Sequence, residues 1–350
     1  MENTLENKEN TPLSQYGEFG LIEHLTQEIE LKNASSVLGV GDDAAIVDVQ
    51  NRYQVISTDL LVEGIHFDMH YTPLKHLGYK AIASNLSDIA AMNAAPEQVL
   101  VSIAISSRYT VEAVEELYQG MRLCCNRYGV DLVGGDTSSS MSGMFLSITV
   151  LGYADKDKIT RRSGANEHDL ICVSGDLGAA YMGLLLLERE KEVYLQSPEN
   201  QPDLAGNDYV LERQLKPEPR LDIVKQLAEK EILPTAMIDI SDGLASEILH
   251  ICKASQKGCC LYEDKLPIDQ STYDLAHEFG IIPSVAALNG GEDYELLFTI
   301  KQADYEKVRQ LQDVSVIGYI TDKSAGCQLI TKDEKAIELK AQGWSSFQKQ

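Results

Sequence analysis

Aspartates recur in short segments beside glycine, serine or threonine. The segments are Gly41-Asp42-Asp43, Ser57-Thr58-Asp59, Leu86-Ser87-Asp88, Gly134-Gly135-Asp136-Thr137 and Asp239-Ile240-Ser241-Asp242-Gly243. Four of the five follow a β-like run, and loops just past a strand end usually display ligand-binding groups. Each segment alone is also an ordinary turn or helix cap. Capping does not explain near-doubled acids such as Asp42/Asp43 and Asp239/Asp242, so we predict that these carboxylates converge.

Carboxylates that converge need a positive partner. Two of them about 4 Å apart repel by about 4 kcal/mol at an effective dielectric constant of about 20. Few basic residues lie next to these segments. Oxygen ligands with neighbouring hydroxyl groups suit Mg²⁺, which takes one or two carboxylates per ion and fills its other positions with water and phosphate oxygens. The segments therefore predict several Mg²⁺ ions that bridge protein acids to a polyphosphate.

The first acidic segment also fits a different motif. Gly39-Val40-Gly41-Asp42-Asp43-Ala44 matches the dinucleotide fingerprint G-x-G-x-x-G/A, with Asp59 about where a ribose-binding acid would stand. That fingerprint offers bare backbone amides to a pyrophosphate at a helix N-terminus. Here two acids occupy the turn and β-like residues, Ala45–Val49, follow it, so a dinucleotide-binding fold is disfavoured. The P-loop motif G-x-x-x-x-G-K-[ST] does not occur in the sequence.

Cysteine and histidine give little support for soft-metal chemistry. The seven cysteines form no C-x-x-C pair, and the seven histidines show no H-E-x-x-H pattern. We expect most of the cysteines to be buried small hydrophobic residues.

Composition narrows the class of protein. The chain has 350 residues, 44% of them hydrophobic, which is enough for two domains with separate cores. A formal net charge of −24 disfavours nucleic acid and anionic membranes as partners. The Met1–Pro12 segment lacks the features of a signal peptide, and the longest apolar run, Leu177–Leu187, is too short to cross a bilayer. We therefore expect a cytoplasmic protein without membrane contact.

Hydrophobic periodicity indicates the elements that must position the acidic segments. Helices are predicted over Gly17–Glu30, Leu74–Met92, Val111–Tyr128, Ala179–Glu188, Pro219–Lys230 and Asp242–Ala254. Strands are predicted over Val37–Val40, Ala44–Val49, Tyr53–Ser57, Val99–Ile105, Leu132–Val133, Phe145–Tyr153, Leu170–Val173, Cys259–Tyr262, Glu295–Ile300 and Val314–Ile320. This order predicts an α/β or α+β fold.

The alternation of elements restarts after Ile159, which predicts two domains. A boundary near Tyr153–Arg161 divides the chain into domains at 1–155 and 156–350. The polar, proline-containing stretch Glu188–Pro219 is expected to be an excursion within the second domain rather than a linker between the two.

The acidic segments belong to a longer ordered series of motifs. The others are Gly17-Glu18-Phe19, Leu60-Leu61-Val62-Glu63-Gly64-Ile65-His66-Phe67, Asn85 to Met92 around Asp88, Thr160-Arg161-Arg162-Ser163-Gly164-Ala165 and Gly290-Gly291-Glu292-Asp293-Tyr294-Glu295-Leu296. In order and spacing, over nearly the whole chain, the sequence closely resembles the thiamine-monophosphate kinases of the aminoimidazole-ribonucleotide-synthetase-like superfamily. The match is highly specific.

This resemblance implies an activity and an architecture. The activity is ATP-dependent transfer of the γ-phosphoryl group to thiamine monophosphate, giving thiamine diphosphate and ADP, the last step of thiamine diphosphate biosynthesis. The architecture is a homodimer in which the N-terminal domains build a shared β-barrel-like core. The N-terminal domain would bind ATP and Mg²⁺, and a C-terminal α/β domain would complete the nucleotide and substrate site.

The resemblance also implies roles for individual residues. The Mg²⁺ ligands would be Asp43, Ser57, Thr58, Asp59, Asp88, Asp136, Asp239 and Asp242. The residues that touch ATP would be Tyr118, Gly135, Arg162 and Ser241. Those that meet thiamine phosphate would be His66, Glu292, Trp344 and Phe347. No general base is expected, because a phosphate oxygen acceptor is already ionised near neutral pH; positioning and charge neutralisation by several Mg²⁺ ions would carry the transfer.

Four of these residues have ordinary structural alternatives. Arg162 either clamps a phosphate through its planar fork or is an exposed loop arginine. His66 either contacts substrate or is a polar residue at a loop end. Trp344 either covers a thiazolium ring by cation–π contact or pins the C-terminal segment to the core. Glu292 either accepts a hydrogen bond from the aminopyrimidine or belongs to a plain turn before a strand.

Rival functions remain within and outside the superfamily. A selenophosphate synthetase would carry a reactive cysteine in a glycine-rich N-terminal segment, but the first cysteine is Cys124. The hydrogenase-maturation relative would end in a cysteine, whereas this sequence ends Phe347-Gln348-Lys349-Gln350. An aminoimidazole-ribonucleotide or formylglycinamidine synthetase is the enzymatic alternative. A non-catalytic acidic cation binder is the alternative from another class, although the calcium-hand spacing D-x-[DN]-x-[DN]-G is lacking.

Overall fold

The N-terminal half of the chain forms one open mixed sheet. In a computed structural model, which describes residues 36–38 and 41–342, its six strands are ordered β1-β2-β3-β6-β4-β5. β4 and β5 run parallel and the other neighbours pair antiparallel. The strands are β1 (Ser36–Leu38), β2 (Ala45–Val49), β3 (Arg52–Val62), β4 (Ala95–Ile105), β5 (Asp131–Ser139) and β6 (Met144–Asp155). Within the described residues of one chain the sheet does not close into a barrel.

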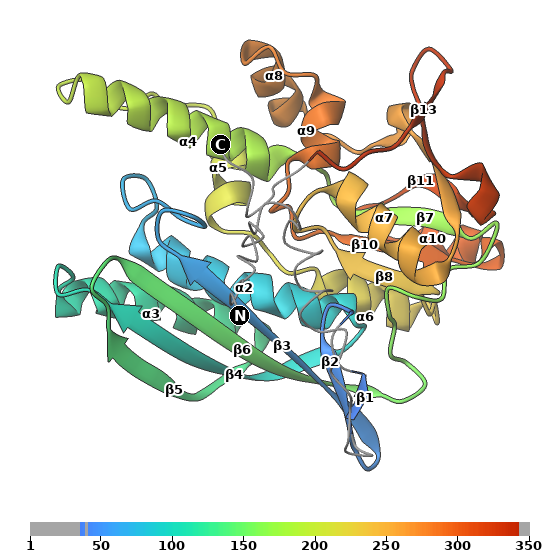
Figure 1. The fold of residues 1–350 in the computed structure, drawn as a ribbon, viewed down its shortest axis with the longest axis horizontal. Helices are drawn as coiled ribbons and strands as arrows, with labels where there is room; N and C mark the ends of the chain where they lie inside the picture. Colours follow the sequence, from blue (N-terminus) through green and yellow to red (C-terminus); the bar gives the residue numbers. More distant parts are fainter. Residues whose placement is uncertain (1–35, 39–40, 343–350) are drawn as a thin grey trace, which may run out of the picture.

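Helices α2 (Leu74–Ala91) and α3 (Val111–Tyr128) cover one face of this sheet (Figure 1). They cross at two glycines. A Cβ atom on Gly78 would lie 2.0 Å from the carbonyl oxygen of Leu117, and one on Gly120 would lie 1.9 Å from that of Lys75. Only glycine allows two helix backbones to approach this closely. The crossing fixes α2, whose side chains are nearly all buried, in one place against the sheet.

The C-terminal half forms a second mixed sheet. Its seven strands are ordered β13-β12-β9-β11-β7-β10-β8, with β12 and β9 parallel and the other neighbours antiparallel. These strands are β7 (Leu170–Ser174), β8 (Ala236–Asp239), β9 (Gly258–Tyr262), β10 (Leu296–Ile300), β11 (Val314–Thr321), β12 (Cys327–Ile330) and β13 (Ala336–Glu338). Its helices are α4 (Ala179–Gln196), α5 (Asp208–Leu215), α6 (Leu221–Glu229), α7 (Leu244–Ser255), α8 (Gln270–Glu278), α9 (Pro283–Asn289) and α10 (Tyr305–Val308).

Helix α2 joins the two halves. Along most of its length it packs into the N-terminal core, but Ala90 and Ala91 at its end belong to a cluster with Met237 and Phe298 of the second sheet. Helix α7 packs on the opposite face of that sheet, where Ile248 is fully buried. Figure 1 shows α2 between the first sheet and the C-terminal half of the molecule. An acidic residue on α2 is therefore held where both halves meet.

The predicted helices and strands that fall in the described residues are present, but β3, β5 and α4 extend well beyond their predicted ends. The placement of three acidic segments on loops was wrong. Ser57–Asp59 lie inside β3, Gly134–Thr137 inside β5, and Ser87 with Asp88 inside α2. In β3 and β5 the β-like pattern ended at the polar residues because few apolar side chains remain there. The hydrogen-bonded pairing of the strands nevertheless continues through them. The predicted helix Gly17–Glu30 lies outside the described residues.

The polar stretch after Glu188 is partly helical. Helix α4 continues to Gln196, and α5 follows and packs on α4 through buried Val210. Figure 1 shows the outer part of α4 extending away from both sheets. The sequence signal missed α5 because an eight-residue helix gives too short a window for periodicity.

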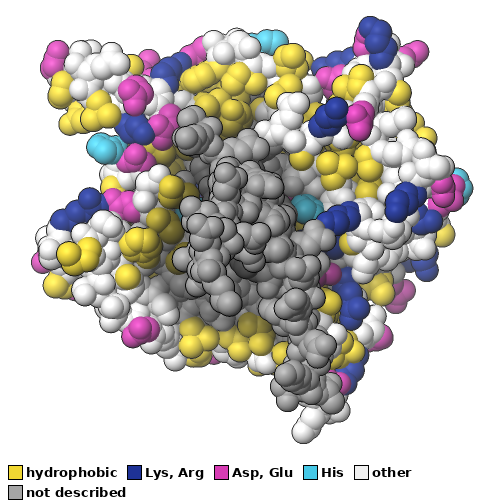
Figure 2. Space-filling model, in the orientation of Figure 1, with side chains coloured by type: hydrophobic (Ala, Val, Ile, Leu, Met, Phe, Trp, Pro, Cys, Tyr) yellow, Lys and Arg dark blue, Asp and Glu magenta, His cyan; other side chains and the backbone are white. Residues whose placement is uncertain are grey.

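The face of the molecule drawn in Figure 2 mixes charges despite the net charge of the chain. Figure 2 shows acidic side chains standing beside Lys and Arg side chains on the face it presents, without one continuous acidic field among the residues drawn in colour. Among the described residues, no helix combines the length and the apolar character that a membrane span requires.

Candidate functional site

Three carboxylates from distant parts of the sequence meet where the two halves join. Asp43 precedes β2, Asp88 lies near the end of α2, and Asp239 is the last residue of β8. One carboxylate oxygen of each lies within 4.8 Å of those of the other two. We call Asp43, Asp88 and Asp239 the acidic cluster. The predicted convergence of these three side chains is confirmed as geometry.

Two serines fix the orientation of the cluster. Ser57 Oγ donates to Asp88 Oδ2 at 2.6 Å, which ties β3 to α2. Ser87 Oγ donates to Asp239 Oδ2 at 2.7 Å, which ties α2 to β8 and so one half of the chain to the other. A hydroxyl group donates only one hydrogen bond, so each carboxylate keeps acceptor capacity for other ligands.

Arg162 is the cation that the structure pairs with the acidic cluster in the described part of the chain. Its Nε and Nη2 atoms donate to the two carboxylate oxygens of Asp43 at 3.0 and 2.7 Å. Its backbone N–H lies 3.2 Å from both carboxylate oxygens of Asp42. Burial and the nearby Arg162 lower the pKa of His250 to about 4, so this histidine adds no positive charge at neutral pH.

The acids at this site are hard to keep ionised. Burial and the neighbouring Asp43 raise the pKa of Asp42 to about 6, and burial raises that of Asp59 to about 6. Burial and the charge of Asp43 raise the pKa of Asp239 to about 8. The pKa of Asp88 also lies well above its ordinary value because the side chain is buried near Asp59 and Asp239. One arginine does not balance this many carboxylates, so the site favours a bound cation.

The loop after Asp239 packs against the glycine-rich loop that precedes β10. Glu292 N–H donates to the Ser241 carbonyl oxygen at 2.7 Å, and a Cβ on Gly291 would lie 2.5 Å from that same oxygen. Asp242 N–H donates to Glu247 Oε1 of α7 at 3.0 Å. Ser241 is exposed and Asp242 is partly buried, so the two predicted site residues stand at the surface beside the cluster.

Glu292 is held by two partners from different helices. Lys80 of α2 lies 3.0 Å from Glu292 Oε1, and Gln214 of α5 donates to Glu292 Oε2 at 2.8 Å. Lys80 is itself buried and also donates to the Gln214 carbonyl oxygen at 3.0 Å. The Glu292 carboxylate thus has a fixed position and a counter-ion, yet about a third of its side chain stays exposed.

Asp59 and Thr58 lie on opposite faces of β3. Asp59 of β3 pairs with Ile148 of β6, whose side chain is buried under the helices. Paired residues point to the same face and alternate residues of a strand do too, so Asp59 and Ser57 both face the helices. Thr58 Oγ1 instead donates to the Ile148 carbonyl oxygen at 3.0 Å and lies 3.0 Å from Thr149 Oγ1. The structure therefore does not bring the Thr58 hydroxyl to the acidic cluster.

Gly135 and Asp136 lie on the edge strand β5, three strands from β3. Asp136 aligns with Ser102, Ser102 with Ser147, and Ser147 with Leu60. With strands about 4.8 Å apart, the two ends of this row are separated by about 14 Å. Asp136 is exposed on the open face of the sheet. Within one chain the structure does not bring Asp136 to the cluster.

His66 lies in the turn after β3, where its Nδ1 accepts a hydrogen bond from the Val62 N–H at 3.0 Å. Because Nδ1 is the acceptor in this contact, a neutral imidazole carries its hydrogen on Nε2. Trp344 and Phe347 lie outside the described residues.

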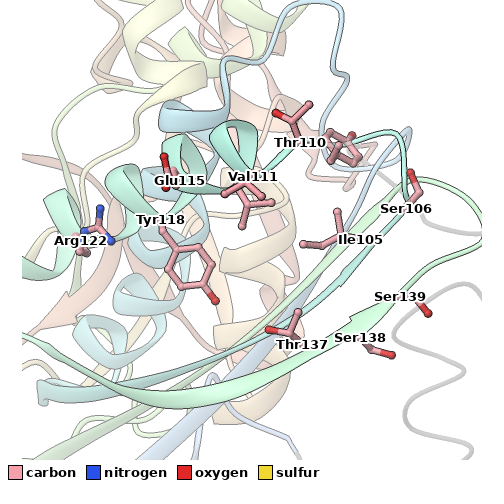
Figure 3. A pocket seen from close by; sticks show the side chains of 12 residues that line it. Ile105, Ser106, Thr110, Val111, Glu115, Tyr118, Arg122, Thr137, Ser138 and Ser139 are labelled. Carbon is pink, nitrogen blue, oxygen red and sulfur yellow. The ribbon is translucent and has the colours of Figure 1, made fainter.

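Tyr118 lines a pocket between α3 and β5. The pocket has a volume of about 570 Å³, and its wall includes Thr137 and Ser138 of β5 with Ile105, Val111 and Arg122 (Figure 3). Figure 3 shows the Tyr118 ring directed toward Thr137. A pocket of this size suits a flat ring system.

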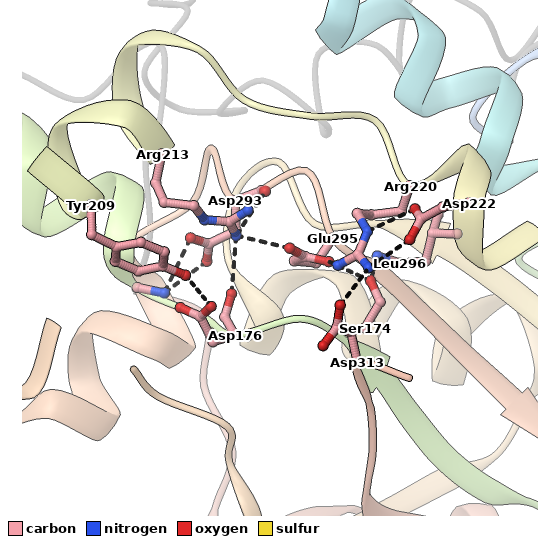
Figure 4. Close-up of polar contacts among 11 residues, drawn as sticks. Ser174, Asp176, Tyr209, Arg213, Arg220, Asp222, Asp293, Glu295, Leu296 and Asp313 are labelled. Carbon is pink, nitrogen blue, oxygen red and sulfur yellow. Dashed lines mark hydrogen bonds and ion pairs between the residues drawn. The ribbon is translucent and has the colours of Figure 1, made fainter. Parts of the chain in front are cut away.

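A second group of buried acids carries its own cations. Glu295 Oε1 lies 2.9 Å from Arg213, and Glu295 Oε2 accepts from Arg220 at 2.6 Å. Asp293 accepts from the Gly178 N–H at 2.9 Å, and Arg213 also donates to the Asp176 carbonyl oxygen at 3.1 Å (Figure 4). We call Asp176, Arg213, Arg220, Asp293 and Glu295 the arginine network. Arg220 has a further partner in an exposed aspartate of α6.

Sequence reasoning missed several residues of this site. Ser87 and Asp42 stood inside predicted motifs, so their proximity to named acids was a usable signal. Lys80 and Gln214 gave no signal, because their importance lies only in contact with Glu292 across the fold.

Comparisons with known proteins show the family of the chain. Residues 41–154 match the family model for AIR synthase related protein, N-terminal domain, and residues 166–328 match the C-terminal domain. The thiamine-monophosphate kinase of Bacillus subtilis (strain 168) is 33% identical over 336 residues, which is 94% of this chain and 99% of that protein.

Two solved structures share both fold and sequence with this chain. The structure described as "AaThiL complexed with AMPPCP and TMP" has a TM-score of 0.81 and 30% identity, covering 97% of this chain and 99% of that one. The thiamine monophosphate kinase from Aquifex aeolicus has a TM-score of 0.76 and 29% identity, covering 94% and 100%.

Proposed function

Because this chain belongs to the thiamine-monophosphate kinases within the AIR synthase related family, we propose how its acidic cluster serves their reaction. The chain has the two-domain α/β fold of that family. The reaction is ATP-dependent phosphorylation of thiamine monophosphate, which gives thiamine diphosphate and ADP. Two anionic groups must come together, so positioning and charge neutralisation supply most of the catalysis.

The acidic cluster is the observation that carries the proposed mechanism. Its three oxygens lie within 4.8 Å of one another, and Arg162 alone does not balance the buried negative charge. Hard carboxylate oxygens are the donors that Mg²⁺ prefers, so the residues fit this ion. Asp43, Asp88 and Asp239 would hold it, with Asp59 and Asp242 beside them. When bound, Mg²⁺ supplies the positive charge that allows donor and acceptor phosphates to approach.

Serines and Arg162 prepare the site for phosphate. Ser57 and Ser87 hold the carboxylates of Asp88 and Asp239 in fixed orientations. Arg162 forms a two-point contact with Asp43, and the same planar fork matches a phosphate. We therefore assign Arg162 to a phosphate of ATP once the cluster holds cations. The acceptor phosphate is ionised at neutral pH, so the site needs no general base.

The position of Glu292 suits the other end of the substrate. Lys80, its ion-pair partner, lies eight residues before Asp88 on α2, which corresponds to about 12 Å along the helix. This separation lets the phosphate of thiamine monophosphate reach the acidic cluster while the aminopyrimidine reaches the Glu292 carboxylate. His66 Nε2 is assigned to the same substrate, as are Trp344 and Phe347.

Nucleotide binding explains the pocket beside Tyr118. Its volume and its tyrosine side chains suit an adenine. Gly135 lies on β5, two residues before Thr137 of the pocket wall, where it would contact the phosphates of the nucleotide. Within one chain, the cross-strand partners between Gly135 of β5 and Asp59 of β3 are Val101 of β4 and Ile148 of β6. Both side chains are buried under the helices. A nucleotide in this pocket therefore does not reach its own acidic cluster along that face.

A homodimer would remove this obstacle. The open face of the N-terminal sheet exposes Leu60, Leu100 and Val133, and β5 is an unpaired edge in the described chain. We propose that two such sheets form a shared barrel-like core, so that Gly135 and Asp136 complete the cluster of the other copy. Residues 1–155 would then bind ATP and Mg²⁺ and dimerise, and residues 156–350 would complete the substrate site.

The activity is tested by measuring ADP release and product identity with purified protein, ATP and Mg²⁺. Thiamine monophosphate should give thiamine diphosphate, whereas the substrates of an aminoimidazole-ribonucleotide or formylglycinamidine synthetase should give no ADP. Turnover with one of those acceptors and not with thiamine monophosphate would assign the chain to the synthetase alternative. Calorimetry adds a second readout: ATP binding should require Mg²⁺, whereas a cation buffer would bind Ca²⁺ without nucleotide.

Mixing inactive variants tests the shared site. Asp88→Asn and Asp136→Asn are each expected to be inactive alone. After mixing and subunit exchange, half of the dimers pair one of each, and one of their two sites is intact, so about a quarter of the wild-type activity should return. A mixture as inactive as its components, although mixed dimers are detected by mass, would place Asp136 and Asp88 in the same chain's site.

A further inference from the structure

Three cysteines gather on one face of the C-terminal sheet, away from the acidic cluster. Cys252 lies in the last turn of α7, Cys259 in β9 and Cys327 at the start of β12. Their Sγ atoms all lie within 4.8 Å of one another. The spacing of the cysteines in the sequence gave little support for a soft-metal site and did not predict that these three thiols meet. The sequence hid the group because Cys327 is far from the other two along the chain.

The fold positions the three thiols by ordinary packing. β12 pairs parallel with β9, and in this register Cys327 stands directly opposite Cys259. Residues paired in this way point to the same face, and α7 covers that face with Cys252 in its buried row. Cys260, the next residue of β9, points to the opposite face. Helix α7 is about 18 Å long and separates the thiols at its end from Asp239 near its start.

The meeting of three thiols suits a metal ion better than a disulfide. One ion can bind all three thiolates, whereas a disulfide would join only two of them and leave the third without a partner. An ion at the centre of a triangle with sides of 4.8 Å lies about 2.8 Å from each corner, and a Zn–S bond is about 2.3 Å. Side-chain shifts of a few tenths of an ångström close this gap without moving the strands.

The surroundings select the ion. Cys252 and Cys259 are buried among apolar side chains, and Cys327 is half-buried. Three thiolates with Zn²⁺ leave one net negative charge, whereas with Cu⁺ they leave two, so the apolar pocket favours Zn²⁺. The accessible side of Cys327 gives the ion an entry path and a position for water as fourth ligand.

We propose that Cys252, Cys259 and Cys327 form a Zn²⁺ site in this protein, separate from the acidic cluster. On binding, three S–H bonds lose their protons to solvent and three Zn–S bonds form, with no change in oxidation state. Zn²⁺ would link the end of α7 to the paired strands β9 and β12.

Cobalt substitution in the full-length protein tests this site directly. The chain is purified with a reductant, stripped with a chelator and titrated with Co²⁺ in excess Mg²⁺, which occupies the carboxylates. Wild type should show sulfur-to-cobalt charge-transfer absorption that saturates at one equivalent and is displaced by Zn²⁺. Cys259→Ser and Cys327→Ser should lower Zn²⁺ affinity by at least about 100-fold, the upper range for loss of an outer-shell partner. Cys260→Ser, the matched control on the opposite face, should bind like wild type.

Thermal unfolding gives a second readout. Zn²⁺ should raise the Tm of wild type and of Cys260→Ser but not of Cys259→Ser. Absence of thiolate-to-cobalt absorption in folded wild type, or equal absorption in Cys259→Ser, would overturn the proposal. Loss of two free thiols under the same reducing conditions would show a disulfide instead and would equally overturn it.

Discussion

Two groups of buried acids lie on neighbouring strands and differ in how their charge is balanced. Asp239 ends β8, Glu295 precedes β10, and the Ile240 N–H donates to the Glu295 carbonyl oxygen at 2.8 Å. In the arginine network, Glu295 has Arg213 and Arg220 as partners within 3 Å. In the acidic cluster, Arg162 reaches Asp43, while burial raises the pKa of Asp239 to about 8.

This difference separates structural acids from functional ones. A buried carboxylate with full counter-charge holds elements together whatever ligand is present. A buried group of carboxylates without enough counter-charge lowers the stability of the folded chain unless a cation binds. Such a group therefore indicates a binding site. One sequence motif holds acids with different partners: in the segment from Gly290 to Leu296, Glu292 contacts Lys80 and Gln214, whereas Glu295 contacts Arg213 and Arg220.

The largest expected effect is on stability, from the arginine network. Glu295→Gln leaves Arg213 and Arg220 buried without their shared charge, which should lower the free energy of unfolding by about 3 kcal/mol or more. Denaturant unfolding followed by circular dichroism measures it. The fraction that stays folded should keep its KM for both substrates. A stability change below about 0.5 kcal/mol, the size of an ordinary surface substitution, would remove the contrast between the two groups.

Substitutions in the acidic cluster are expected to lower activity and to leave stability unchanged or raised. Asp88→Asn should lower kcat by at least about 10²-fold, the order lost when one charge-stabilising group is removed. Its Tm without Mg²⁺ should be unchanged or higher, because one repelling carboxylate is gone. Asp59→Asn should behave in the same way. Asp131→Asn, an exposed acid at the start of β5, serves as the control and should match wild type. Turnover like that of wild type in both site variants would refute their assignment to Mg²⁺.

Stability without divalent cations should fall as pH rises. The pKa of Asp59 is about 6 and that of Asp239 about 8 in the folded chain, and both groups have ordinary values near 4 when unfolded. Between those values the folded state binds more protons than the unfolded state, so each pH unit costs up to about 1.4 kcal/mol per group. Unfolding in EDTA from pH 5 to pH 8.5 should show this decline.

Magnesium and a substitution provide the controls for the pH series. Mg²⁺ should flatten the decline, because a bound cation replaces the protons. Asp239→Asn should also reduce it, because the group with the higher of the two pKa values is gone. An Asp239→Asn variant whose Tm falls with pH as steeply as that of wild type would show that other groups cause the decline.

The smallest effect is expected for Glu292, whose charge is partly balanced by Lys80. Glu292 is partly exposed and paired with Lys80, so Glu292→Gln should change stability by less than about 1 kcal/mol. It should raise KM for thiamine monophosphate several-fold and leave KM for ATP unchanged, because the proposed role of Glu292 is to contact thiamine monophosphate only. Steady-state kinetics with each substrate varied in turn gives the ratio. Equal shifts in both KM values would place Glu292 outside the substrate site.

Sequence reasoning predicted helices and strands better than it predicted the contacts of single side chains. The helices over Leu74–Met92 and Val111–Tyr128 were predicted almost to the residue, since each runs for 18 residues and so gives a long window for the sequence signal. The acidic segments in β3 and β5 were mistaken for loops, because polar residues inside a strand weaken its pattern. The contacts of Glu292 with Lys80 and Gln214 had no counterpart in the sequence.

Residue types and their local order determined that this chain carries carboxylates fit for divalent cations, and that α and β elements alternate around them. These properties depend on neighbours in the sequence. Tertiary structure decided which acids remain unbalanced, that Asp136 stands three strands away from Asp59, and that three distant cysteines meet behind α7. Charge balance and ligand geometry depend on distances of a few ångströms between segments far apart in the chain, and only the packed fold fixes those distances.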